Sequence, residues 1–197
     1  MALRITDESG EIVVEPVKIH LDEWKVGFNP DLYLGIRLRQ VLFYHFADLL
    51  HQQIAGFDGG RVQVQFALQK QNIPESDIKP GDAIMFHTGW GSLWMKNNDR
   101  FNSGEPGIGL DAARWVIEKD LALTAADTWA VEVVPNPDKS LAFAVHAELQ
   151  TKHGILNHEN LIFDELVAEK KYQFVYCFTP APIKGATGSN GCPIAIT

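Results

Sequence analysis

The stretch DAIMFHTGW, residues 82–90, is the part of the sequence that decides the fold. It is a short apolar run that ends at a glycine, and such a run predicts a buried strand. A helical pattern follows in LDAARWVIEKD, residues 110–120, and LALTAADTWAVEVV, residues 121–134, predicts one or two further strands. Strands and helices mixed in this way indicate an α/β or α+β sheet domain.

The same mixture continues to the C-terminus. SLAFAVHAELQTK, residues 140–152, predicts a helix that carries Leu141, Val145 and Leu149 on one stripe. Beyond it we expect a strand that begins at the GIL of residues 154–156, a short amphipathic helix at 163–171, and strands within 172–178 and 192–196.

The first seventy-odd residues carry patterns that do not connect to this second half. RLRQVLFYHFADLLHQQIA, residues 37–55, has a helical period, and RVQVQF, residues 61–66, alternates as a half-exposed strand does. The inward candidates on the predicted helix are Val41, Tyr44, Leu49 and Ile54. We therefore divide the chain into residues 1–75, an N-terminal segment of unclear relation that could pack on the main domain, and residues 76–197, an α/β domain.

Composition limits the partners of the protein. Its 197 residues are 46% hydrophobic and 21% charged, which is typical of a soluble globular protein. The net charge of −8 disfavours nucleic acid or an anionic membrane as a partner, and from the residue pattern we expect neither a membrane-spanning segment nor a signal peptide. Cys177 and Cys192 do not form a disulfide framework, so we expect buried thiols in a reducing cytoplasm.

The residues with the most metal-binding potential lie in VHAELQTKHGILNHENL, residues 145–161. Divalent zinc or manganese is held by neutral imidazole together with carboxylate. If a helix ends near Lys152 and a strand begins at Gly154, His146 and Glu159 can converge although thirteen residues separate them. Spacing alone favours the simpler alternative, in which both side chains are solvated, and we expect His153 and His158 to be solvated too.

Two other features admit functional interpretations that are weaker than their structural ones. KGATGSNG, residues 184–191, lacks the spacing of a phosphate loop, which favours a tight turn with positive φ over a phosphate site. Asp127 follows a predicted strand, where it could serve chemistry or cap a turn. Neither serine nor cysteine stands in a nucleophile-elbow context.

The chain from Lys79 to Ile196, about 60% of its length, resembles the C-terminal part of the cyclase family of metal-dependent hydrolases, which includes kynurenine formamidases and isatin hydrolases. The matching phrases, in family order, are KPGDAIMFHTGWGSLW, GEPGIGLDAARWVIEKDL, ADTWAVEVVP, VHAELQTKHGILNHENL and IKGATGSNGCPIAI.

This resemblance implies a three-layer β/β/α fold of the swivelling type and a zinc or manganese ion bound partly by His146 and Glu159. It also implies hydrolysis of an aromatic amide, formamide or cyclic amide by metal-activated water, as in an arylformamidase, in a homodimer or higher homo-oligomer. Trp90, Trp94 and Trp129 are candidates for aromatic walls of the substrate site, although a core position is the simpler interpretation for each.

The N-terminal half departs from the family. The family signature there, a histidine followed by Gly-Thr-His, a close Asp and Pro-x-His, supplies the remaining metal ligands and the histidine that acts as acid and base. His20, His45 and His51 do not stand in that pattern. Two hypotheses follow: a hydrolase whose missing ligands come from these histidines or from a partner subunit, or a non-catalytic, truncated or rearranged family remnant that lacks half of the metal site.

Overall fold

The structure is a computed structural model, and it describes residues 58–197 together with the backbone of three short strands nearer the N-terminus. The chain divides into two units, Met1–Gly35 and Ile36–Thr197. In the first unit, β1 (Ile5–Thr6) pairs antiparallel with β2 (Ile12–Val13). All further elements belong to the second unit.

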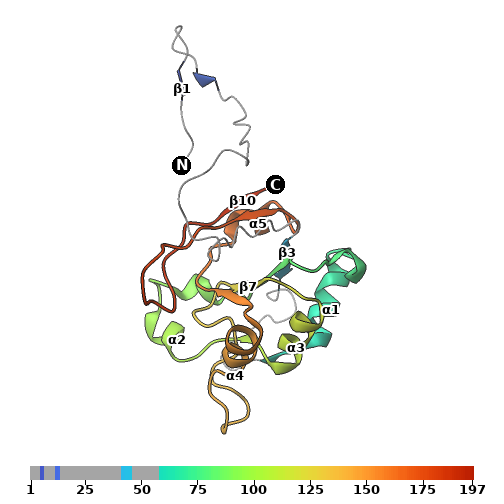
Figure 1. Cartoon of the computed structure of the whole chain (residues 1–197), viewed down its shortest axis with the longest axis vertical. Coiled ribbons are helices and arrows are strands. Elements are labelled where there is room, and N and C mark those ends of the chain that lie inside the picture. Colours follow the sequence, from blue (N-terminus) through green and yellow to red (C-terminus); the bar gives the residue numbers. More distant parts are fainter. Residues whose placement is uncertain (1–4, 7–11, 14–40, 46–57) are drawn as a thin grey trace. The chain divides into compact units, whose positions relative to one another are not determined.

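The second unit is built on a four-stranded parallel sheet (Figure 1). Its strands, in spatial order, are β3 (Val41–His45), β5 (Ala83–His87), β7 (Leu123–Ala126) and β8 (Leu156–His158). Residues 83–86 and all of β7 are buried, as expected for parallel strands that are covered on both faces. The strand predicted within residues 82–90 is therefore confirmed.

Helices cover one face of this sheet. They are α1 (Arg61–Lys70), α3 (Leu110–Glu118), and α4 (Ala144–His146), which continues as the π-helix η4 (Ala147–Lys152). Ile84 and Phe86 of β5 belong to the same buried cluster as Val64 of α1, Trp115 of α3 and Leu149 of η4. This cluster is the larger of the two hydrophobic cores within residues 58–197.

An antiparallel hairpin covers the opposite face. It consists of β9 (Val175–Cys177) and β10 (Ile194–Ile196), with Ala195 opposite Tyr176. Met85 of β5 and Ala125 of β7 alternate with the residues of the first core and pack with Phe163 and Tyr176 in the second core. The helices, the sheet and the hairpin form three layers, so the predicted β/β/α fold is confirmed.

Short elements connect these layers. They are β4 (Asp58–Gly59) paired with β6 (Gly107–Ile108), the 3₁₀ helices η2 (Glu75–Asp77) and η3 (Trp90–Leu93), and the helices α2 (Asn98–Asn102) and α5 (Asp164–Ala168). No helix in the described part of the chain combines the length and the apolar character that crossing a bilayer requires.

Two secondary-structure predictions for the N-terminal half were wrong. The predicted strand at residues 61–66 is the start of α1, which buries Val64, Ala67 and Leu68 at the helical spacing i, i+3, i+4 and leaves Val62 70% exposed. Residues 41–45, predicted as helix, form β3, because parallel pairing with β5 satisfies their backbone groups. The remainder of that predicted helix lies outside the described residues.

The division of the chain between residues 75 and 76 stays a prediction. Two elements that precede residue 76, β3 and α1, pack with elements that follow it. Strand β3 pairs with β5 from Val41 opposite Ala83 to His45 opposite His87. Helix α1 contributes to the larger core. Elements on both sides of the predicted division therefore share one sheet and one core.

The prediction that both thiols are buried was wrong. Cys177 and Cys192 are exposed and free. Strand β9 turns only Tyr176 inward, so its neighbours Val175 and Cys177 lie on the outer face of the hairpin.

Candidate functional site

The candidate site lies beside the carboxyl end of β8, where parallel α/β sheets commonly bind ligands. Glu159 follows the last residue of this strand, and His146 is the last residue of α4. The structure brings the two side chains together, with His146 Nε2 3.2 Å from Glu159 Oε1. Both are partly open to solvent, with 26% of the His146 side chain and 35% of the Glu159 side chain exposed.

A third residue, Glu132, holds His146 from the other side. Its carboxylate is only 1% exposed, and its Oε1 lies 2.5 Å from His146 Nδ1. The same carboxylate accepts the backbone N–H groups of His146, at 2.9 Å, and Val145, at 3.2 Å. A neutral His146 therefore carries its proton on Nδ1 and turns the Nε2 lone pair toward Glu159.

In the absence of a metal ion, the two carboxylates also favour the protonated imidazolium form of His146. The hydrogen bonds with Glu132 and with Glu159 raise the pKa of His146 to about 9, against a smaller opposing effect of burial. A metal ion at Nε2 would displace that proton, so metal binding would release a proton near neutral pH.

The contact between His146 and Glu159 fits two ligands of one metal ion. Nitrogen and oxygen ligands lie about 2.0 to 2.2 Å from zinc, so two of them at ordinary coordination angles are separated by about 3 to 3.5 Å. The observed 3.2 Å falls in this interval. A carboxylate on the second ring nitrogen, here Glu132, is also the usual partner of a metal-binding histidine. Within residues 58–197, however, no group of three or more His, Cys, Asp or Glu side chains could hold a metal ion.

Glu105 fixes the loop that carries Glu132. It is fully buried, and its carboxyl oxygens accept the backbone N–H groups of Trp129, at 2.7 Å, and Ala130, at 2.8 Å. Burial raises the pKa of Glu105, and the two backbone hydrogen bonds lower it. Burial is the larger effect, so the pKa is raised to about 8. Neither Glu105 nor Glu132 was predicted as a site residue. The available signal was an acidic residue within the apolar run AVEVV, residues 130–134.

Asp127 has a structural role in the turn after β5. Its Oδ1 accepts the backbone N–H of Thr88 at 2.8 Å and the Thr88 hydroxyl at 2.7 Å. Its Oδ2 lies 3.8 Å from His87 Nε2 and 3.3 Å from the backbone nitrogen of Gly91. These contacts match the capping alternative that the sequence left open.

The remaining predicted histidines have separate surroundings. His153 is exposed, as expected, with Nδ1 2.8 Å from the Glu148 carbonyl oxygen. The prediction that His158 is solvated was wrong, because this half-buried ring has its Nδ1 within hydrogen-bond distance of the Tyr176 hydroxyl, at 2.5 Å, and packs against Phe178. Burial lowers the pKa of His158. His20 and His51 lie outside the described residues, and of His45 only the backbone is described.

The three candidate tryptophans differ in burial. Trp90 is a core residue with 1% exposure, whereas Trp94 is 56% exposed. Trp129 is half-buried, and its ring lies 6.5 Å from that of Phe143, which in turn lies 5.5 Å from the His146 ring. Of the three, Trp129 connects to the candidate site through an aromatic contact.

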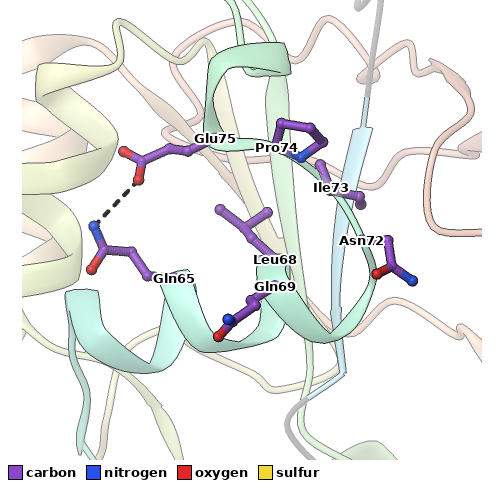
Figure 2. Close-up of a pocket in the computed structure, with 7 residues that line it drawn as sticks. All are labelled: Gln65, Leu68, Gln69, Asn72, Ile73, Pro74 and Glu75. Atoms are coloured by element: carbon purple, nitrogen blue, oxygen red, sulfur yellow. Dashed lines mark hydrogen bonds between the residues drawn. The ribbon is translucent and has the colours of Figure 1, made fainter.

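A separate hollow of about 450 Å³ lies between α1 and η2. Figure 2 shows its lining residues, with the hydrogen bond from Gln65 to Glu75 at 3.3 Å. The Glu75 carboxylate also accepts the Trp115 indole N–H and pairs with Lys119 at 2.8 Å. The acidic group of this hollow is thus neutralised within the protein, and His146, Glu132 and Glu159 are not part of its lining.

Comparisons with known proteins show which family and which solved structures this chain resembles. Residues 46–133 match a family described as "Putative cyclase". The resemblance to the cyclase family that the sequence predicted is confirmed. The match begins before residue 79, where the sequence placed its start, and ends before residues 145–161, which carry His146 and Glu159.

Solved structures with a similar fold include members described as cyclases and isatin hydrolases. A novel cyclase is 28% identical, with a TM-score of 0.69 over 80% of this chain and 53% of its own. An isatin hydrolase bound to the product analogue thioisatinate is 15% identical, with a TM-score of 0.69 over 88% of this chain and 65% of its own. Isatin hydrolase A from Labrenzia aggregata, bound to benzyl benzoate, is 16% identical, with a TM-score of 0.67 over 82% of this chain and 62% of its own.

The chain thus spans between about half and two thirds of the length of these three structures. Another similar structure, 14% identical with a TM-score of 0.56, is described as a potential metal-dependent hydrolase with cyclase activity. No curated protein matches the chain in sequence.

Proposed function

We propose that this protein is a metal-dependent hydrolase of the cyclase type that cleaves an amide, formamide or cyclic amide. The observation that carries the proposal is the contact of His146 Nε2 with Glu159 Oε1, at 3.2 Å, together with the Glu132 carboxylate on His146 Nδ1. The family match and the isatin hydrolases among the similar structures support the reaction class.

In this proposal each residue has a defined task. His146 presents Nε2 and Glu159 presents Oε1 to a shared zinc or manganese ion. Glu132 fixes the orientation and tautomer of His146 from the buried side. When bound, a divalent ion supplies Lewis-acid polarisation of a carbonyl and lowers the pKa of water. Further ligands and the acid–base group would come from His20, His45, His51 or a second subunit of a homo-oligomer. The proposed location of the protein is a reducing cytoplasm.

The metal content of the purified protein tests this proposal first. We expect about one zinc or manganese ion per site in the wild type, and loss of at least tenfold in metal affinity in His146→Ala and Glu159→Gln. His153→Ala is the matched control, because His153 is an exposed histidine next to the same helix. Equal metal loss in the control would contradict the assignment.

The substrate class is tested with the metal-loaded protein. N-formylkynurenine, isatin and a simple lactone, assayed side by side, separate formamide, cyclic amide and lactone hydrolysis. We expect turnover of at least one of the two nitrogen-containing substrates, and none in His146→Ala.

A second candidate is a non-catalytic member that keeps the fold. It is favoured by the absence of a third ligand beside His146 and Glu159 among residues 58–197. Metal content near zero after incubation with both ions, in a protein with an intact cooperative unfolding transition, would support this candidate over the hydrolase.

A further inference from the structure

Phe143, which immediately precedes α4, has an unusual backbone. Its φ of 50° and ψ of 41° place it in the left-handed region, which a bulky side chain rarely adopts. Its carbonyl oxygen accepts the backbone N–H of Ala147 at 3.1 Å, so the residue begins the helix that ends at His146. Glycine or asparagine would occupy this conformation with less strain.

Burial of the ring does not explain why a phenylalanine stands here. The residue is 49% exposed, so it leaves much of its apolar surface in water. Residues held in sparsely populated backbone conformations cluster at active sites and ligand clamps. Phe143 combines backbone strain, exposure and an aromatic ring.

The ring stands edge-on to the candidate site. Its centroid lies 5.5 Å from that of the His146 ring at an interplanar angle of 86°, and 6.5 Å from that of Trp129 at 62°. Trp129 is itself fixed, because its backbone N–H donates to Glu105 and its indole N–H donates to the Phe101 carbonyl oxygen at 3.2 Å. Phe143 thus lies between a fixed tryptophan and the proposed metal ligand.

We infer that Phe143 is a specificity-determining residue whose ring packs against the planar aromatic part of a substrate bound at the His146–Glu159 pair. This inference rests on the proposed function. Aromatic rings pair edge-to-face or offset at centroid distances of about 4.5 to 7 Å, so an aryl group beside Phe143 places an attached carbonyl near His146. An alkyl group of similar length makes no such pair.

Two formamides that differ in this respect test the inference: formanilide, which carries a phenyl ring, and N-butylformamide, which does not. In zinc-loaded protein we expect Phe143→Ala to weaken formanilide binding about tenfold, measured by calorimetry or as KM. N-butylformamide binding should stay within about twofold, and so should the zinc affinity. Phe66→Ala removes a partly exposed phenylalanine of α1 and should change none of these values.

The Tm of a glycine variant at residue 143 distinguishes a role in substrate binding from a role in stabilising the fold. Phe143→Gly should weaken formanilide binding as the alanine variant does, yet raise the Tm by about 1 to 4 °C because the left-handed strain is removed. Lys170→Gly, at another residue with positive φ (54°), should raise the Tm without affecting either formamide. These controls separate relief of strain from loss of the ring.

Each outcome decides one question. Equal binding of formanilide by wild type and Phe143→Ala, or an equal loss for both formamides, would overturn the role of Phe143. Absence of formanilide binding by a wild type that binds zinc would overturn it as well. If zinc does not bind, the proposed function fails, and calorimetry with the metal-free proteins then decides the aromatic contact by itself: a loss of formanilide binding confined to Phe143→Ala supports it, and equal binding by both proteins overturns it.

Discussion

At the scale of single residues, a buried carboxylate determines what His146 can do. Glu132 accepts two backbone N–H groups and contacts the His146 ring, so it connects the fold of the 131–134 segment to the orientation of the imidazole. We expect Glu132→Gln to lower zinc affinity about 10- to 100-fold, because an amide cannot accept from Nδ1 and both N–H groups as a carboxylate does. Isothermal titration of the metal-free protein measures this change.

The matched control is Glu148→Gln, which alters a partly exposed carboxylate on η4 that pairs with Lys152. It should leave zinc affinity within about twofold. Glu132→Ala should in addition lower the free energy of unfolding by about 2 to 4 kcal/mol, because it leaves buried N–H groups without an acceptor. A zinc affinity equal to wild type in Glu132→Gln would show that His146 does not depend on this carboxylate.

Glu105 gives the protein a defined pH dependence. Burial raises its pKa to about 8 in the folded protein, whereas an exposed glutamate in the unfolded chain titrates near 4.5. Between these values the folded state binds more protons than the unfolded state, so stability falls as the pH rises from about 4.5 to 8. The loss should be on the order of 5 kcal/mol.

Urea unfolding of wild type and Glu105→Gln in EDTA, at several pH values between 5 and 9, measures this effect. As the pH rises, the unfolding free energy of the wild type should fall relative to that of Glu105→Gln. The variant removes one hydrogen-bond acceptor, which adds an offset that does not change with pH. Parallel curves for the two proteins would contradict a raised pKa of Glu105.

The sequence predicted half of the site because two of its residues stand in a family phrase. His146 and Glu159 were named from that phrase, and the structure places them in contact, while their role as metal ligands stays a prediction. Glu132 was not named, because nothing in the linear sequence shows that a carboxylate thirteen residues earlier than Val145 turns toward the same ring. Contacts of this kind are created by the tertiary fold.

At the scale of elements, predictions succeeded where both periodicity and burial pointed to one structure. Strand β5 and helix α3 formed as expected, because β5 is a continuous buried run and α3 buries Ala112, Trp115 and Val116 on one side. Helix α1 was missed because Val62, Val64 and Phe66 alternate like a strand, yet only Val64 of these is buried. Tertiary packing selected the helical period instead.

The contact between β6 and the segment that carries Glu132 leaves no room for a side chain at Gly107. A Cβ there would lie 2.3 Å from the Glu132 carbonyl carbon and 2.4 Å from the Val131 carbonyl oxygen, both backbone atoms. We expect Gly107→Ala to lower the unfolding free energy by about 2 to 4 kcal/mol and to weaken zinc binding, since Glu132 must move. Denaturant unfolding and zinc titration provide the two measurements.

Gly188→Ala is the control for this substitution, because a Cβ at Gly188 meets nothing within 4 Å. It should change the unfolding free energy by less than about 0.5 kcal/mol. Loss of stability in Gly107→Ala with unchanged zinc affinity would contradict this prediction, because it would show that the packing of β6 does not affect the position of His146.

At the scale of the whole molecule, the two hydrophobic cores found among the described residues lie within Ile36–Thr197. A unit that contains these cores and the four-stranded parallel sheet has what independent folding requires. We therefore expect a protein that starts at Ile36 to unfold in one cooperative transition, with a Tm within about 5 °C of that of the full chain. Circular dichroism and calorimetry on the two proteins measure this directly. A broad, non-cooperative transition or persistent aggregation of the shorter protein would show that residues 1–35 contribute to the stability of the sheet domain.

The same pair of proteins also tests one proposed source of the missing ligand, because the shorter one lacks His20. Unchanged zinc affinity would leave the segment after Gly35, or a second subunit, to complete the coordination of His146 and Glu159.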